Sequence, residues 1–113
     1  MIVMNEEIKR KLLECIDEGL NSLGRTVKQV IYWYLENKFG VKRCDILDKP
    51  EEFIRALELM YGCGVVVLEN MIVSKIREEF NVQSEDFIGA IMEIKRRYDS
   101  FSKIQNYFII LIV

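Results

Sequence analysis

Residues 84–113 read SEDFIGAIMEIKRRYDSFSKIQNYFIILIV, and this stretch decides the fold class. Apolar residues recur in it at alternating spacings of four and three, which is the pattern of a helix that packs through a heptad seam. Ser84, followed by two acidic residues, is expected to cap the first turn. The pattern predicts a long C-terminal helix of about 29 residues, or roughly 43 Å. Its d-type positions are Phe87, Ile94, Phe101 and Phe108, and its a-type positions are Ile91, Tyr98, Gln105 and Ile112.

The last part of this helix is apolar on every side. Nine of the thirteen residues from Phe101 to Val113 are apolar, which is too many for one helix face. Such a helix either completes the core of its own chain or packs against another chain. The second interpretation is favoured, because a short chain has few helices with which to cover all sides. Gln105 is then expected to face its own copy across a two-fold axis. The predicted interface comprises Phe101, Ile104, Gln105, Phe108, Ile109, Leu111 and Ile112.

Four shorter helices are predicted before it. The first is capped by Asn5 and the second ends at Gly40, after a run so apolar that burial on several sides is expected. Asp48, followed by Pro50, is expected to start the third, and the fourth begins with the β-branched residues 65–67, which have no plausible partner strand. With one proline and six glycines in 113 residues, the sequence predicts an all-α single domain, residues 1–113, of about five helices.

Residues suited to catalysis or metal binding are scarce. Histidine is absent, and the three cysteines are widely spaced without a CxxC pair, so we expect no enzymatic activity, no metal site and no cofactor. Cys15 lies on the apolar face of the first helix and is expected in the core. Cys63, between two glycines near a helix start, is the one candidate reactive thiol, although a structural role is favoured.

The charge balance argues against a general affinity for nucleic acid. Sixteen basic and eighteen acidic residues give a net charge of -2. The basic stretch Lys95, Arg96 and Arg97 is nevertheless a possible nucleic-acid contact, which leaves a small nucleic-acid-associated regulator as the alternative function. The longest apolar run reaches roughly 10 Å as a helix, against a membrane core of about 30 Å, so no membrane span is expected. Without a secretory signal or a disulfide pattern, a cytoplasmic location is predicted.

The central stretch, residues 22–81, contains a succession of glycines, aromatic residues and capping residues: Leu23-Gly24, Tyr34-Leu35-Glu36, Phe39-Gly40, Pro50, Phe53, Leu57, Gly62, Gly64, Leu68-Glu69 and Ile72. This succession resembles a small archaeal family of helical output domains first grouped in Nitrosopumilus. The resemblance implies a module that follows signalling domains and acts by protein contact. We therefore expect a non-catalytic protein-interaction or regulatory module that forms a homodimer through its C-terminal helix.

Overall fold

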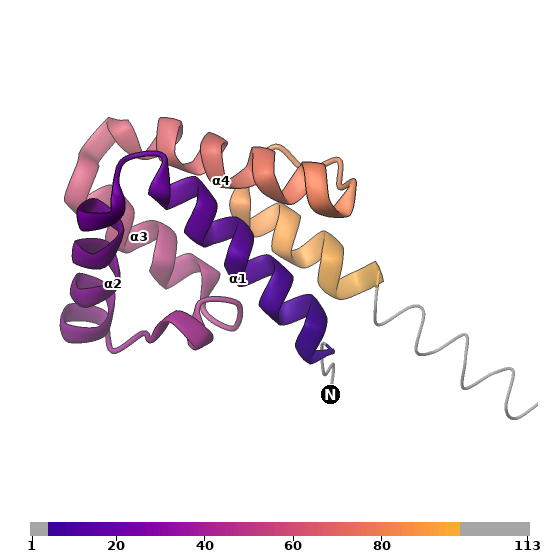
Figure 1. The fold of residues 1–113 in the computed structure, drawn as a ribbon, viewed down its shortest axis with the longest axis horizontal. Helices are drawn as coiled ribbons and strands as arrows, with labels where there is room; N and C mark the ends of the chain where they lie inside the picture. Colours follow the sequence, from indigo (N-terminus) through magenta and orange to yellow (C-terminus); the bar gives the residue numbers. More distant parts are fainter. Residues whose placement is uncertain (1–4, 98–113) are drawn as a thin grey trace, which may run out of the picture.

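The computed structural model describes residues 5–97, and within this range the chain is all-helical, as predicted (Figure 1). Four complete α-helices are present there, fewer than the five or so expected. Residues 87–97 are also helical, but the chain beyond them lies outside the described range. The helices are α1 (Glu6–Asn21), α2 (Arg25–Phe39), α3 (Pro50–Tyr61) and α4 (Val65–Phe80), with the short 3-10 turns η1 (Arg43–Asp45) and η2 (Gly62–Gly64) between them.

Helices α1 and α4 form the most extensive contact of the bundle and cross at Gly19. A Cβ atom on Gly19 would lie 2.6 Å from Cγ1 and 2.9 Å from the Cα of Ile72. Only hydrogen fits between the two backbones there, so this glycine sets the distance between the helices. Asn5 caps α1 as predicted, because its Oδ1 accepts a hydrogen bond from the Glu7 N–H at 2.8 Å.

Helix α2 differs from its prediction. Only Ile31 and Leu35 are buried in it, whereas Val30 and Trp33 are largely exposed. The helix lies at one side of the bundle, where it packs on α1 and α3 and leaves its outer face open (Figure 1). Its apolar composition was therefore a poor guide to burial. Gly40 does end it in the left-handed conformation, at φ 66°, as expected.

The chain turns sharply between α3 and α4. Gly62 has φ 58° and ψ -132°, a conformation that side chains disfavour, and the two helices leave the turn in different directions (Figure 1). Residues 65–67 are helical, as predicted. The cap predicted for α3 is wrong: Lys49 occupies the N-cap position, with no side-chain bond, and Asp48 lies one residue too early. Pro50 does occupy the first turn.

The helical stretch Pro50–Phe80 is long and apolar enough to span a membrane by length and composition alone. One 18-residue window in it has a mean hydropathy of 1.6, and a third of that window is buried in the fold. Core helices of globular proteins pass the same test, and here the stretch is divided by the Gly62 turn. The expected absence of a membrane span stays a prediction.

The helix at residues 87–97 is capped by Asp86 and not by Ser84, which corrects the prediction. Asp86 Oδ1 accepts from the Gly89 N–H at 2.8 Å, and the Asp86 carbonyl accepts from Ala90. Ser84 instead donates its hydroxyl to Asp86. Asp86 acts as the cap because its carboxylate reaches the free N–H groups of the first turn, whereas Ser84 lies two residues too far upstream.

Twenty-four apolar side chains of the described residues are buried in one core, and no polar or charged residue of this range is buried. Phe53 of α3 meets Phe87 of the last helix with ring centroids 5.2 Å apart. The core therefore joins α1, α3, α4 and residues 87–97.

Candidate functional site

The predicted interface residues, Phe101, Ile104, Gln105, Phe108, Ile109, Leu111 and Ile112, lie outside the described residues. The beginning of the heptad seam that leads to them is within the described residues. Phe87, Ile91 and Ile94, its first three positions, are fully buried in the chain's own core. The first part of the heptad pattern therefore packs inside one molecule.

The basic stretch is largely engaged in contacts with the chain itself. Lys95 Nζ donates to the Leu47 carbonyl at 2.6 Å, and the Arg97 guanidinium donates to the carbonyls of Phe80 at 2.6 Å and Asn81 at 3.3 Å. The Leu47 carbonyl lies in the α2–α3 connection, and those of Phe80 and Asn81 lie at the end of α4, where backbone acceptors lack helical partners. Only Arg96 is exposed and without a contact of this kind. Two of the three basic side chains thus contact the backbone of the chain itself, and a nucleic-acid contact of this stretch stays a prediction.

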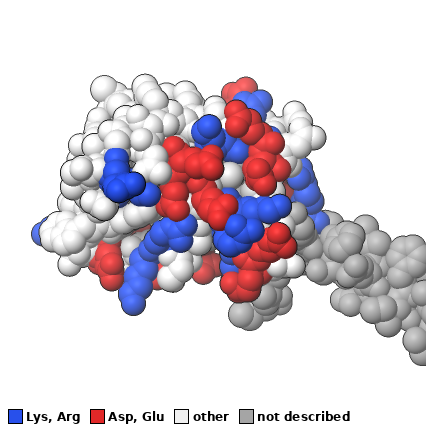
Figure 2. Space-filling view, in the orientation of Figure 1, with Lys and Arg blue, Asp and Glu red and all other residues white. Residues whose placement is uncertain are grey.

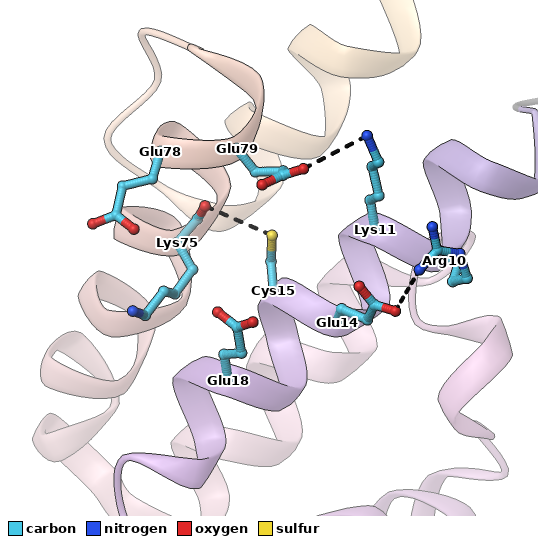
Figure 3. Close-up of a pocket in the computed structure, with 8 residues that line it drawn as sticks. All are labelled: Arg10, Lys11, Glu14, Cys15, Glu18, Lys75, Glu78 and Glu79. Carbon is cyan, nitrogen blue, oxygen red and sulfur yellow. Dashed lines mark hydrogen bonds and ion pairs between the residues drawn. The ribbon is translucent and has the colours of Figure 1, made fainter.

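A charged groove of about 170 Å³ runs between α1 and α4 (Figure 3). Cys15 lies at its floor, and its thiol donates to the Lys75 carbonyl with a sulfur–oxygen distance of 3.6 Å. Cys15 is buried, as predicted. The charged residues around it are Arg10, Lys11, Glu14, Glu18, Lys75, Glu78 and Glu79.

The Cys15 thiol is poorly suited to chemistry. Burial, together with the negative charges of Glu79, Glu18, Glu14 and Glu78, raises its pKa to about 11. A nucleophilic cysteine needs positive surroundings that favour the thiolate, and this groove provides the opposite. Among the described residues, no group of three or more His, Cys, Asp or Glu is arranged to hold a metal ion. The groove therefore joins two helices and carries no recognisable reaction centre.

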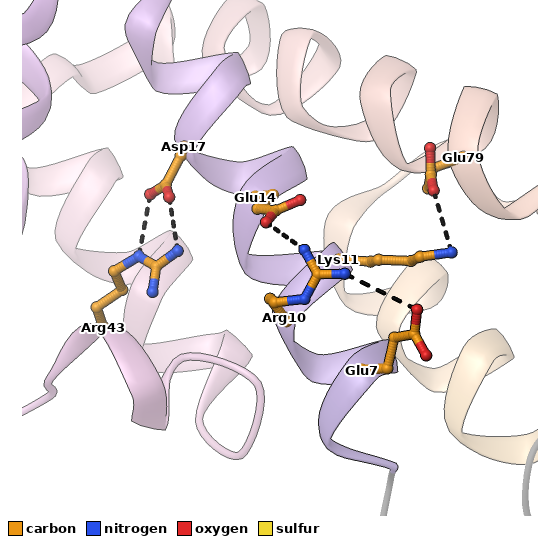
Figure 4. A network of polar contacts seen from close by, with 7 residues as sticks. All are labelled: Glu7, Arg10, Lys11, Glu14, Asp17, Arg43 and Glu79. Atoms are coloured by element: carbon orange, nitrogen blue, oxygen red, sulfur yellow. Dashed lines mark hydrogen bonds and ion pairs between the residues drawn. The ribbon is translucent and has the colours of Figure 1, made fainter.

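Ion pairs lie on the surface beside this groove (Figure 4). Arg10 pairs with Glu14 at 2.6 Å and with Glu7 at 3.8 Å, and Lys11 reaches from α1 to Glu79 of α4 at 3.7 Å. All of these groups are well exposed, so each pair contributes little to stability, typically less than about 1 kcal/mol.

Asp17 makes a stronger contact that the sequence did not suggest. Its carboxylate accepts two hydrogen bonds from Arg43, at 3.1 and 2.6 Å (Figure 4). It also accepts one from the Tyr32 hydroxyl. Burial alone would raise the pKa of Asp17, but these bonds outweigh it and hold the pKa below its ordinary value. Burial and the bond to Asp17 raise the pKa of Tyr32. The three residues fasten α2 and the loop after it to α1.

Glu69 also has a role that composition did not reveal. Its Oε2 accepts from the backbone N–H of Phe87 at 2.9 Å, so a side chain of α4 completes the start of the last helix. Glu36, which follows the buried Leu35 of α2, is exposed. Cys63 is exposed within η2 and does not fill a gap in the core.

The exposed apolar side chains around η2 form a second candidate site, which we call the apolar tip, residues 59–67. Leu59 is 65% exposed, and Val66 and Val67 are 56% and 57% exposed. The tip contains no charged residue. In Figure 2, the upper left of the molecule, where Figure 1 places the α3–α4 turn, is free of Lys, Arg, Asp and Glu, while charges crowd the middle and right. This uncharged surface has the character of a protein contact.

No known protein family, curated protein or solved structure matches the chain. The resemblance to archaeal output domains therefore stays a prediction, and function has to be argued from the described residues and the sequence.

Proposed function

We propose that the chain is a non-catalytic protein-interaction module that associates with itself through residues 101–113. The observation that carries the proposal is the core of the described helices. It buries 24 apolar side chains and already takes in Phe87, Ile91 and Ile94, the first three positions of the heptad seam. The nine apolar residues from Phe101 to Val113 come in addition to these, in a chain of only 113 residues.

The energetic argument concerns those nine residues. A large apolar side chain left in water forgoes roughly 1.5–3 kcal/mol that burial would provide. A second copy carries the same segment and the same need, so mutual burial satisfies both chains at once. A regulatory role in the cytoplasm is part of the proposal, supported by the exposed free thiols of Cys44 and Cys63, which suit a reducing compartment.

The proposal is tested by light scattering coupled to gel filtration. We expect the full chain to have twice the monomer mass of 13.4 kDa, and a chain truncated after Ser102 to be monomeric and to keep its helical circular dichroism. A full chain that is folded and still monomeric at about 100 µM, a concentration at which even a weak dimer forms, contradicts the proposal. A truncated chain that unfolds also contradicts it, because the segment then belongs to the chain's own core.

A matched pair of substitutions separates the apolar contact from a general effect of charge. Phe108→Glu adds one negative charge at an apolar position, and Asn106→Glu adds the same charge at a polar position two residues away. We expect the first to dissociate the dimer and the second to leave it intact. Equal behaviour of the two variants would speak against association through the apolar positions.

A further inference from the structure

The apolar tip is exposed because of helical phase. In α3, Ala56 and Leu57 point into the core, so Leu59 faces outward. In α4, Val65 and Leu68 point inward, so Val66 and Val67 face outward. The Gly62 turn lies between these two helices, and η2 is exposed there as well. The described residues leave this surface uncovered.

The tip lies at one end of α4, and the described chain leaves from the other end. Phe87 donates its N–H to Glu69, near the start of α4, and Arg97 donates to the carbonyl of Phe80, at its end. The helix at residues 87–97 therefore runs in the same direction as α4, as Figure 1 also shows. Since α4 has 16 residues, the two ends are about 24 Å apart at about 1.5 Å per residue.

A return of the same chain to its own tip meets an unsuitable surface. The exposed side chains in the second half of α4 are polar or charged: Ser74, Arg77, Glu78 and Glu79. A segment with nine apolar residues in thirteen would have to reverse direction and lie over these groups, and their burial without partners costs free energy. A second molecule can present the same segment to the tip without crossing that surface.

We infer that residues 101–113 of a second copy cover the apolar tip, so that the dimer forms by exchange of this segment. The inference rests on the proposed function and adds the surface that receives the segment. An uncharged tip suits an apolar segment, whereas the charged groove between α1 and α4 does not. When each copy gives its segment to the other, the exchange is reciprocal and closes as a two-fold dimer.

The affinity of tip variants for dimer formation tests the inference. Val67→Glu adds a negative charge at the tip, and Met92→Glu adds one at a side chain of similar exposure on the last helix. We expect Val67→Glu to raise the dimer dissociation constant at least tenfold and Met92→Glu to leave it unchanged. If Phe108→Glu dissociates the dimer while Val67→Glu and Leu59→Glu do not, the segments pair with each other, and the inference falls while the proposed function stands. A monomeric wild-type chain removes both.

The exposed thiol of Cys63 gives a direct second measurement. In a chain carrying Cys44→Ser and Ile110→Cys, mild oxidation is expected to join Cys63 of one copy to position 110 of the other and give a covalent dimer. Cys63→Ser is the control that abolishes it. A disulfide within one chain shows that the segment covers its own tip, and a covalent dimer that survives Cys63→Ser shows pairing of two segments. Either result overturns the inference.

Discussion

Two stretches of α4 are equally apolar and are buried to very different degrees. Ile72, Val73 and Ile76 pack against α1 and are almost inaccessible to solvent, while Val66 and Val67, one to two turns earlier, are more than half exposed. The first stretch faces a helix that approaches to the distance allowed by a glycine, whereas the described residues leave most of the second stretch open to solvent. Burial thus depends on what lies opposite an apolar side chain. The apolar tip has the composition of a core and the exposure of a surface.

The largest expected effect on folding stability is a difference between two leucines of α3. Leu57 is fully buried and Leu59 is largely exposed. We expect Leu57→Ala to lower the free energy of unfolding by roughly 2–5 kcal/mol and Leu59→Ala by no more than about 0.5 kcal/mol. Urea unfolding followed by circular dichroism measures both, in dilute solution so that association does not contribute. Similar losses for the two variants would show that Leu59 is buried within the monomer.

Substitution of two glycines by alanine is expected to give the next largest difference in folding stability. Gly19→Ala places a methyl group against the backbone of Ile72 and is expected to cost about 1–3 kcal/mol, despite the better helix propensity of alanine. Gly64→Ala, at φ -64° with only the Tyr61 Cβ nearby at 3.7 Å, is expected to be neutral or to stabilise by up to about 1 kcal/mol. Thermal unfolding measures both. A Gly19→Ala chain as stable as the wild type would mean that α1 and α4 pack less closely.

The bonds of Asp17 are expected to have a smaller effect that depends on pH. Asp17→Asn keeps the shape but removes the charge that Arg43 and Tyr32 bind, and we expect a loss of roughly 1–2 kcal/mol at pH 7. Glu14→Gln, in an exposed pair with Arg10, is the control and is expected to cost less than about 0.5 kcal/mol.

The pH dependence follows from the direction of the shift. The pKa of Asp17 is lower in the folded chain than its ordinary value of 3.8, so the unfolded chain binds a proton more readily. The stabilisation is therefore fully present above the unfolded pKa and is lost as the pH falls through the lower folded pKa. Urea unfolding of the wild type and Asp17→Asn between pH 7 and pH 2 should show the two stabilities converging at the acid end. A constant difference would contradict this assignment.

The sequence predicted the helical elements well because their limits are local. Asn5 and Gly40 act through their own backbone and near neighbours, and they cap the helices where expected. The Ser84 prediction failed because two acceptors compete for the same N–H groups, and Asp86 lies nearer. The burial of α2 was overestimated because an apolar helix at the side of a bundle has neighbours on one face only.

The contacts that define the candidate sites could not be read from the sequence. Asp17 meets Arg43 across 26 positions, and Glu69 meets Phe87 across 18. The partners of each pair lie in different elements, so no spacing along one helix predicts the contact. Gly19 resembled any other glycine in a helix, yet it sets the closest approach of two helices. The basic stretch was visible, but the carbonyls that bind Lys95 and Arg97 lie elsewhere in the chain.

The reactivities of the three thiols can be compared in the unaltered chain, without any substitution and without any change in folding stability. Cys15 is buried with its pKa raised from 9.0 to about 11, whereas Cys44 and Cys63 are exposed. At pH 8 we expect Ellman's reagent to modify two thiols rapidly, and Cys15 only as α1 and α4 separate. Three rapid thiols would contradict the close packing of these helices.

The same reaction sharpens the comparison between the covered and the uncovered part of α4. If a second copy covers the apolar tip, Cys63 becomes shielded as the protein concentration rises through the dimer dissociation constant, while Cys44, in η1, stays accessible. We therefore expect the rate at Cys63 to fall relative to that at Cys44 in the full chain, and the two rates to keep a constant ratio in Phe108→Glu. If the ratio of the two rates does not change with concentration in either chain, the tip stays exposed in the dimer. The chains would then associate without covering the tip.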